Sequence, residues 1–158
     1  MTDLINKFLD KNFDQKREQV ETSGFVEDLM NGTKFKGVMV VITDKDIYNK
    51  NNNFCFGTSY SGTDENEYVV ISTNRVKEKS HLAFILIHEL GHSYGAAKKG
   101  REHTDESLGI HCTNDGCVMQ QKIDMREALS YAEKVYKKKI FFCNECKKDI
   151  ENYKNNNL

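Results

Sequence analysis

The sequence predicts an α/β (α+β) fold, in which a small, mixed and twisted sheet accompanies a long apolar helix and a cysteine-rich C-terminal part. Residues 37–43 and 68–73 are rich in β-branched and aromatic residues, as is typical of buried strands. Residues 82–94 form an apolar segment of helical length that contains an H-E-x-x-H motif. Four cysteines follow in two close pairs, a pattern that indicates metal binding.

The N-terminal part is predicted to be helical. Apolar residues recur at helical spacing over residues 3–30, so we expect helix there, with breaks near Asn12 and Gly24. Asn31 and Gly32 together form a helix stop signal.

The sheet follows. The segment 37–43 is apolar throughout, which predicts a strand that is buried on both faces. The polar residues 44–53 are expected to form a loop. Residues 54–60 alternate weakly and predict a second strand, and residues 68–73 predict a third.

The apolar helix 82–94 is expected to be central, because it is apolar nearly all round. Ser80 is its predicted N-cap and Gly95 its predicted end, while His81 should be exposed or act as a cap. Asp124 should begin an amphipathic helix with Glu127 as part of a capping-box-like start, and residues 155–157 should form a frayed tail.

The H-E-x-x-H motif comprises His88, Glu89 and His92. Positions i and i+4 share one face of a helix, so both imidazoles can bind one metal ion. Zinc takes such nitrogen ligands at about 2.0–2.1 Å and keeps an open position at catalytic sites. Glu89 can reach a water in that position and act as the catalytic general base.

The cysteines predict a second zinc. The spacings Cys112-x4-Cys117 and Cys143-x2-Cys146 allow four thiolates to surround one ion, as in closed structural zinc sites. Unliganded buried thiols and a redox pair at Cys143 and Cys146 are the alternatives. Cys55 lies alone in an apolar segment, which indicates simple packing.

The composition limits the cellular location and the binding partners that we expect for the protein. The counts of 23 Lys+Arg and 24 Asp+Glu give a net charge of -1, which argues against nucleic acid as a partner. Residues 1–7 lack the features of a signal peptide, and no apolar run approaches the ~20 residues that span a bilayer. We therefore expect a cytoplasmic monomer that binds no membrane, with its cysteines reduced.

Three segments together resemble one family. Residues 88–95, 111–119 and 143–146 are similar to the pattern H-E-x-x-H-x-x-G-x-x-H-C-x4-C-x-M, followed by C-x-x-C, of the archaemetzincins, zinc metallopeptidases of the metzincin clan. The likeness covers residues 37–148. It implies a metzincin-like zincin domain, one catalytic and one structural Zn²⁺ per chain, and Met119 beneath the catalytic site. It also implies a peptide or protein substrate.

The chain departs from the family pattern at the third ligand. Lys98 occupies that position, and a protonated lysine has no lone pair to give a metal. Residues 98–110 look like an insertion, after which His111 directly precedes Cys112, as the family's third ligand does. We therefore expect His111 to be the third ligand. The alternatives lie within the insertion: His103, Glu102, Asp105 and Glu106.

Two functions remain open from the sequence. The first is a zinc-dependent peptidase, formed by one domain of residues 1–158 with subdomains 1–95 and 96–158, and with 54–60 as the edge strand that binds substrate. The second is an inactive, zinc-stabilised protein-binding module. The presence of Glu89 favours the enzyme, because a pure binding module needs no base at that position.

Overall fold

The computed structural model describes residues 1–50, 52–62, 66–122 and 124–157. The chain forms two compact units, Met1–Lys77 and Glu78–Leu158, and each is described by itself. The single domain that the sequence predicts, with subdomains 1–95 and 96–158, stays a prediction.

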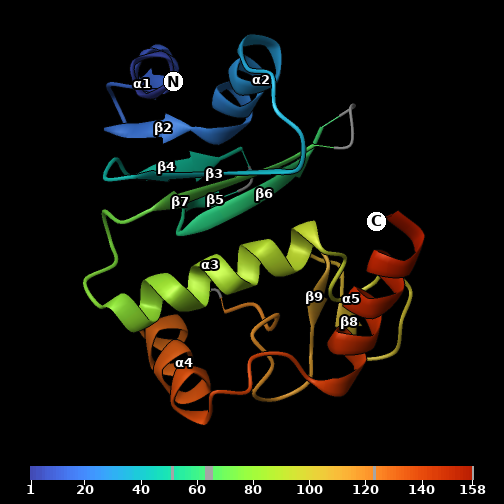
Figure 1. The fold of residues 1–158 in the computed structure, drawn as a ribbon. Coiled ribbons are helices and arrows are strands. Elements are labelled where there is room, and N and C mark those ends of the chain that lie inside the picture. The colour runs from blue at the N-terminus through green and yellow to red at the C-terminus, as the bar shows by residue number, and fades with distance from the viewer. Residues whose placement is uncertain (51, 63–65, 123, 158) are drawn as a thin grey trace. The chain divides into compact units, whose positions relative to one another are not determined.

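The first unit combines two helices with two small sheets. Its helices are α1 (Thr2–Lys11) and α2 (Thr22–Gly32), which lie side by side on one side of the strands (Figure 1). Its strands are β1 (Phe13–Asp14), β2 (Gln19–Glu21), β3 (Val38–Thr43), β4 (Ile47–Asn49), β5 (Asn52–Cys55), β6 (Gly57–Ser61) and β7 (Glu67–Ser72). The predicted end of the second helix at Gly32 is confirmed.

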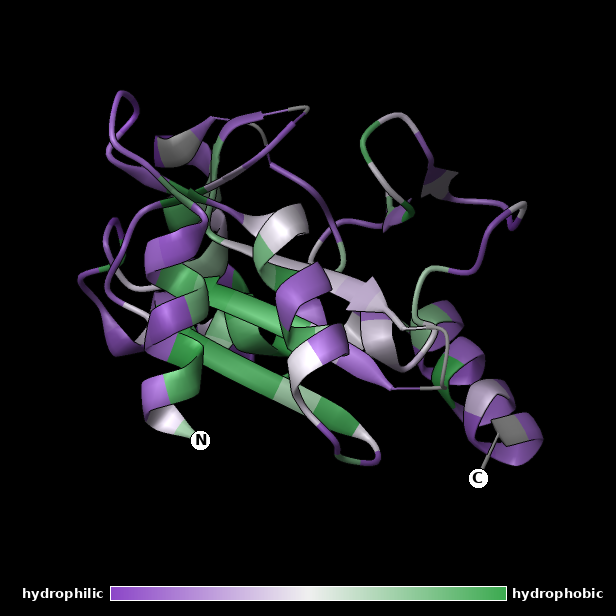
Figure 2. Ribbon diagram, turned by 90° about the horizontal axis from the view of Figure 1, so that it is seen from above, coloured by the Kyte–Doolittle hydropathy of each residue, from purple (hydrophilic) through white to green (hydrophobic). Residues whose placement is uncertain are grey.

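Both sheets are mixed, which confirms the predicted fold class. In one sheet the order is β3-β7-β6, with β3 parallel and β6 antiparallel to β7. In the other the order is β1-β2-β4-β5, and β2 runs parallel to β4. The hydrophobic residues gather on the longest strands, while the loops are mainly hydrophilic (Figure 2).

The strand β3 is present, but the prediction that both of its faces are buried is wrong. Val41 and Thr43 are buried, whereas Val40 and Ile42 are exposed, Ile42 to 53%. The reason is that β3 is the last strand of its sheet, and its alternate side chains point away from the core. An apolar run therefore does not distinguish a central strand from this edge strand.

Two further predictions for the first unit are wrong. Residues 12–21 do not continue the helix, because β1 and β2 pair as a hairpin in which Phe13 lies opposite Val20. The carboxylate of Asp14 caps the turn by accepting hydrogen bonds from the backbone N–H groups of Lys16 and Arg17. The expected loop 44–53 instead contains β4 and part of β5.

The second unit contains α3 (Lys79–Ser93), β8 (Thr104–Asp105), β9 (His111–Cys112), α4 (Met125–Lys138) and α5 (Asn144–Asn157) (Figure 1). The helix predicted over residues 82–94 is confirmed as α3, although it begins earlier, with Glu78 and not Ser80 as the N-cap. Gly95 ends it as predicted. At φ +70° its N–H donates to His92 and that of Ala96 to Gly91, which is a Schellman motif.

α4 packs against α3. Asp124 caps α4 as predicted, by accepting a hydrogen bond from the N–H of Glu127. His81 is buried with its Nε2 3.6 Å from a carboxylate oxygen of Glu133 in α4, so its predicted exposure is wrong. The predicted frayed tail is wrong as well, because α5 continues to Asn157.

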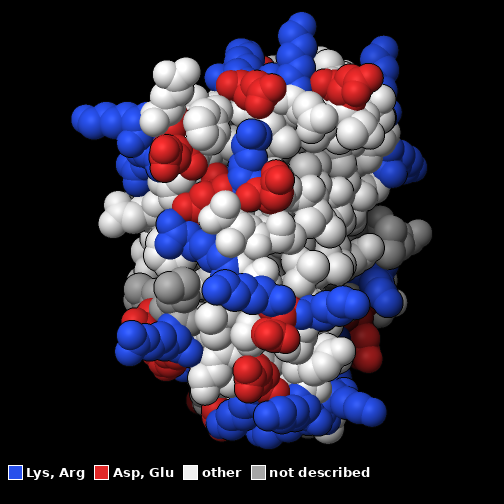
Figure 3. All heavy atoms as spheres, turned by 90° about the vertical axis from the view of Figure 1, so that its left-hand side faces the viewer, with Lys and Arg blue, Asp and Glu red and all other residues white. Residues whose placement is uncertain are grey.

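Charge and hydropathy agree with the balanced composition. On the face that Figure 3 shows, Lys and Arg side chains are interspersed with Asp and Glu, as the net charge of -1 leads us to expect. None of the helices, over the residues that the structure describes, has the length and apolar character to cross a lipid bilayer.

Candidate zinc sites

Three histidines of the second unit converge. α3 carries His88 and His92 one turn apart on the same face, and β9 brings His111 against them. One nitrogen of each ring lies within 4.8 Å of one nitrogen of the other two. The ring of His111 is 5.3 Å from that of His88 and 4.9 Å from that of His92, between centroids.

The geometry of this cluster fits a zinc ion. Four ligands at about 2.0–2.1 Å in tetrahedral arrangement lie roughly 3.3–3.4 Å from one another, and the Nε2 atoms of His88 and His92 are 3.2 Å apart. His88 Nδ1 is 2.7 Å from the carbonyl oxygen of Val118, which can only accept, so this nitrogen carries the proton. Nε2 of His88 therefore keeps its lone pair for a metal. Nδ1 of His111 is buried and has no hydrogen-bond partner among the described residues.

The surroundings keep these imidazoles neutral, as metal ligands must be. Burial, with a contribution from His111, lowers the pKa of His88 to about 4. Burial and the two neighbouring rings lower the pKa of His92 to about 2. Burial also lowers the pKa of His111. At neutral pH each ring therefore offers a lone pair.

Glu89 and Met119 complete the surroundings of the histidines. Glu89 follows His88 in α3 and is buried. Met119 is fully buried, and its carbonyl oxygen accepts a hydrogen bond from the N–H of Cys112, the residue after His111. Met119 therefore lies in a turn that is hydrogen-bonded to β9.

The rival third ligands lie elsewhere. Lys98 is exposed. The side chain of His103 is 48% exposed, and its Nδ1 lies 3.2 Å from a carboxylate oxygen of Glu145. The remaining rivals are all exposed: Glu102, Asp105 and Glu106. Over the described residues, the cluster around His88 comprises only His92 and His111 in addition.

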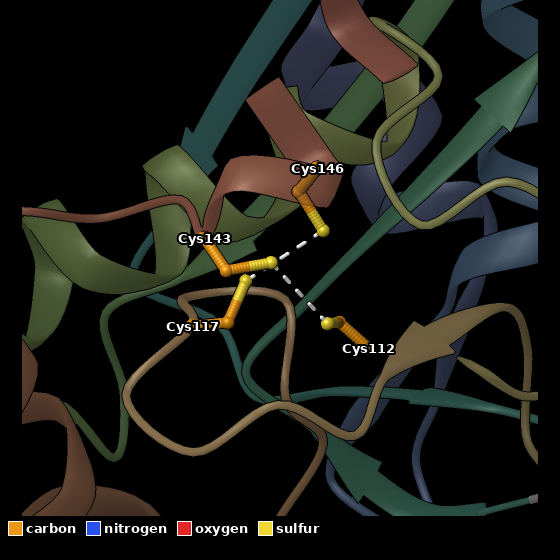
Figure 4. Close-up of side chains that lie close together, drawn as sticks. All are labelled: Cys112, Cys117, Cys143 and Cys146. Carbon is orange, nitrogen blue, oxygen red and sulfur yellow. Dashed lines mark hydrogen bonds between the residues drawn. The ribbon is translucent and has the colours of Figure 1, made fainter. Parts of the chain in front are cut away.

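The four paired cysteines also converge, as Figure 4 shows. Cys112 comes from β9, Cys117 from the following loop, Cys143 from the position just before α5, and Cys146 from the first turn of α5. The Sγ atoms of Cys112 and Cys143 are 3.7 Å apart, and so are those of Cys117 and Cys146. Tetrahedral zinc with sulfur at about 2.3 Å requires about 3.8 Å between sulfurs, whereas a disulfide requires about 2.05 Å.

Nitrogen donors surround these sulfurs. The backbone N–H of Asn114 donates to Cys112 at 3.5 Å, and its side-chain amide donates to Cys143 at the same distance. Arg101 Nη2 donates to Cys146 at 3.4 Å. Sequence reasoning missed both Asn114 and Arg101, since neither belongs to a ligand motif. Such donors stabilise thiolates, the form that binds metal.

The contact between Cys117 and Cys146 shifts the pKa values of the two thiols in opposite directions. It lowers the pKa of Cys117. The same contact, together with burial, raises the pKa of Cys146. A divalent ion would replace the shared proton and bind both sulfurs as thiolates.

Comparisons with known proteins identify the family of the chain. The model of the family described as Reprolysin (M12B) family zinc metalloprotease matches residues 25–148. Archaemetzincin from Nanoarchaeum equitans is 30% identical over 116 residues, which cover 73% of this chain and 54% of that protein. The chain belongs to the archaemetzincin family of zinc metalloproteases. Its resemblance to that family is thereby confirmed.

Further relatives extend the archaemetzincin likeness over most of the chain. Archaemetzincin from Haloarcula marismortui is 26% identical over 153 residues, covering 87% of this chain and 75% of that protein. The crystal structure of archaemetzincin from Methanopyrus kandleri shares the fold, with a TM-score of 0.68 and 18% identity over 98% of this chain and 87% of that one. The chain thus spans about half of the Nanoarchaeum protein and most of the other two.

Proposed function

We propose that the chain is a zinc-dependent peptidase in which His88, His92 and His111 hold the catalytic metal. The observation that carries this proposal is the convergence of three neutral imidazoles, one from each of three points in the sequence, at the spacing of zinc ligands. Membership of a zinc metalloprotease family supports it.

The residues of the site then have distinct roles. Zinc, when bound, supplies a Lewis acid that polarises a peptide carbonyl and lowers the pKa of water to about 7. Val118 orients the ring of His88 through the hydrogen bond to Nδ1. Glu89 accepts a proton from the attacking water and delivers it to the nitrogen of the leaving amine.

A second zinc, held by the four cysteines, is the structural part of the proposal. It would join β9 to the start of α5, and so would fix the strand that carries His111. The 3.7 Å spacing of the sulfurs supports it. The chain would then bind two zinc ions of different accessibility.

The substrate is a peptide or a protein, and β6 is the proposed docking strand. Among the described residues β6 pairs with β7 alone, and a peptide could pair with its other edge by β-augmentation. The predicted strand 54–60 falls partly in β5 and partly in β6. The remaining proposals are a monomeric, cytoplasmic enzyme without nucleic-acid or membrane partners.

Glu89→Gln separates the peptidase from an inactive binding module. The variant should keep its zinc and lose hydrolysis of a quenched fluorescent peptide library, because glutamine cannot accept the proton. Glu151→Gln, at an exposed position of α5, is the matched control and should remain active. Hydrolysis by Glu89→Gln at the wild-type rate would exclude Glu89 as the base, and an inactive wild-type protein with full zinc would favour the binding module.

A further inference from the structure

Arg101 lies at the centre of a group of polar contacts beside the four cysteines. Its side chain is only 15% exposed. Nη2 donates to the sulfur of Cys146 at 3.4 Å, Nη1 lies 2.6 Å from Glu145, and Nε lies 2.9 Å from Asp149. These three partners all belong to α5, whereas Arg101 belongs to the segment 98–110, which looks like an insertion in the family pattern.

The backbone around Arg101 is held as well. The hydroxyl of Thr104 donates to the carbonyl oxygen of Arg101. Thr104 and Asp105 form β8, which pairs with Cys112 and His111 of β9. Segment 98–110 therefore contacts both pieces of chain that supply cysteines, through a strand pair on one side and Arg101 on the other.

The contact between Arg101 and Cys146 places a positive charge beside the cysteine cluster. Four thiolates outweigh the charge of one divalent ion, so a zinc site of this kind carries an excess of negative charge that must be compensated when it is partly buried. Arg101 brings a cation and an N–H donor directly against one of the sulfurs. Glu145 and Asp149 hold the guanidinium in that position.

We propose that Arg101 is a positioning residue of the four-cysteine zinc site, and that segment 98–110 helps to retain this zinc by contacting both pieces of chain that supply cysteines. The inference rests on the proposed structural zinc. It assigns a role to the segment that departs from the family pattern. Groups next to metal ligands typically change metal affinity by about ten- to a hundredfold when they are lost.

The test compares Arg101→Gln with Lys99→Gln in the full chain. Lys99 is a cation of the same segment. Its side chain is 75% exposed, and its ion pair is with Glu106 and not with a group at the cysteines. Competition with a chromogenic chelator should show about ten- to a hundredfold weaker zinc binding at the cysteine site in Arg101→Gln, and wild-type binding in Lys99→Gln. In cobalt-substituted protein, the thiolate-to-cobalt absorption band should shift in Arg101→Gln alone.

The outcomes separate this inference from the structural zinc itself. If the metal content of Cys143→Ser equals that of the wild type, the proposal of a structural zinc is wrong. If wild type holds it, but Arg101→Gln matches Lys99→Gln in affinity and in the cobalt band, the role of Arg101 is wrong, even where the melting temperature falls. Should Arg101→Gln not fold, Arg101→Lys replaces it: a single ammonium cannot keep all three contacts. Wild-type affinity and band in that variant would overturn the proposal.

Discussion

Gly91 and Met119 lie so close together that a β-carbon on Gly91 would overlap the sulfur of Met119. The same β-carbon would lie 3.0 Å from the ring of Phe142. Gly91 lies between Glu89 and His92 in the last turn of α3, and glycine inside a helix costs up to about 1 kcal/mol relative to alanine. The close approach of Met119 to α3 explains why glycine is needed there.

Gly91→Ala should therefore destabilise the protein, contrary to the usual effect of this change in a helix. Overpacking of a closed core costs about 1–3 kcal/mol, which exceeds the gain in helix propensity. The free energy of unfolding, measured in denaturant, should fall. In a Met119→Ala background the same change should cost less, because the space is free. Stabilisation of the wild-type background by Gly91→Ala would mean that Met119 does not occupy this position.

His111→Ala should lose the catalytic zinc, while His103→Ala should keep it. His111 contacts the rings of His88 and His92, whereas His103 is half exposed and contacts Glu145. Zinc content after dialysis against a weak chelator, together with peptide hydrolysis, is the measurement. The reverse pattern, with zinc lost from His103→Ala, would place the third ligand in segment 98–110.

Cys143→Ser should lower the melting temperature sharply, and Cys55→Ser only slightly. Apparent binding energies of structural zinc reach about 10–16 kcal/mol, and Cys143 belongs to the sulfur cluster. Cys55, half-buried against the core of the first unit, is the matched control. Equal melting temperatures for the two variants, in protein purified without chelator, would argue for ordinary free thiols.

The carboxylate of Asp46 should make the first unit sensitive to acid. Burial raises its pKa, but hydrogen bonds from Arg75 and Gln19, the charge of Arg75 and a backbone N–H outweigh burial and lower it overall. A lowered pKa stabilises the fold above the unfolded value of about 3.9, and this stability is lost as the pH falls through the folded value.

Asp46→Asn should therefore lower the free energy of unfolding at pH 7 by about 1.5–3 kcal/mol, the contribution of hydrogen bonds to a charged group. It should also flatten the dependence on pH below pH 4, as measured by denaturant unfolding at several pH values. Asp10→Asn is the control. The side chain of Asp10 is 73% exposed, and its ion pair with Lys45 is long, at 3.9 Å. An equal loss in both variants would show that the buried network contributes nothing specific.

The sequence predicted the candidate sites better than the sheets. Spacing along one helix determines that His88 and His92 share a face, and a short loop keeps Cys112 near Cys117, so local geometry was sufficient. Each of these two relationships spans only a few residues of chain. The choice of His111 rested instead on the resemblance, because the family's third ligand directly precedes the cysteine that corresponds to Cys112.

The features that sequence reasoning missed depend on distant partners. The hairpin of β1 and β2 forms because Val20 pairs with both Phe13 and Ile47. The helical spacing of the apolar residues did not indicate these pairings. The exposure of Ile42 depends on the strand order of the sheet. The contact of Arg101 with Cys146 joins residues 45 positions apart, and no motif contains both.

The most direct test of the two metal sites is a crystal structure of the purified protein with anomalous diffraction measured on both sides of the zinc absorption edge. We expect two zinc peaks. One should lie about 2.0–2.1 Å from nitrogens of His88, His92 and His111, and the other about 2.3 Å from the sulfurs of the four clustered cysteines. A map without a zinc peak between the three histidines, or with His103 as a ligand there, would contradict the account.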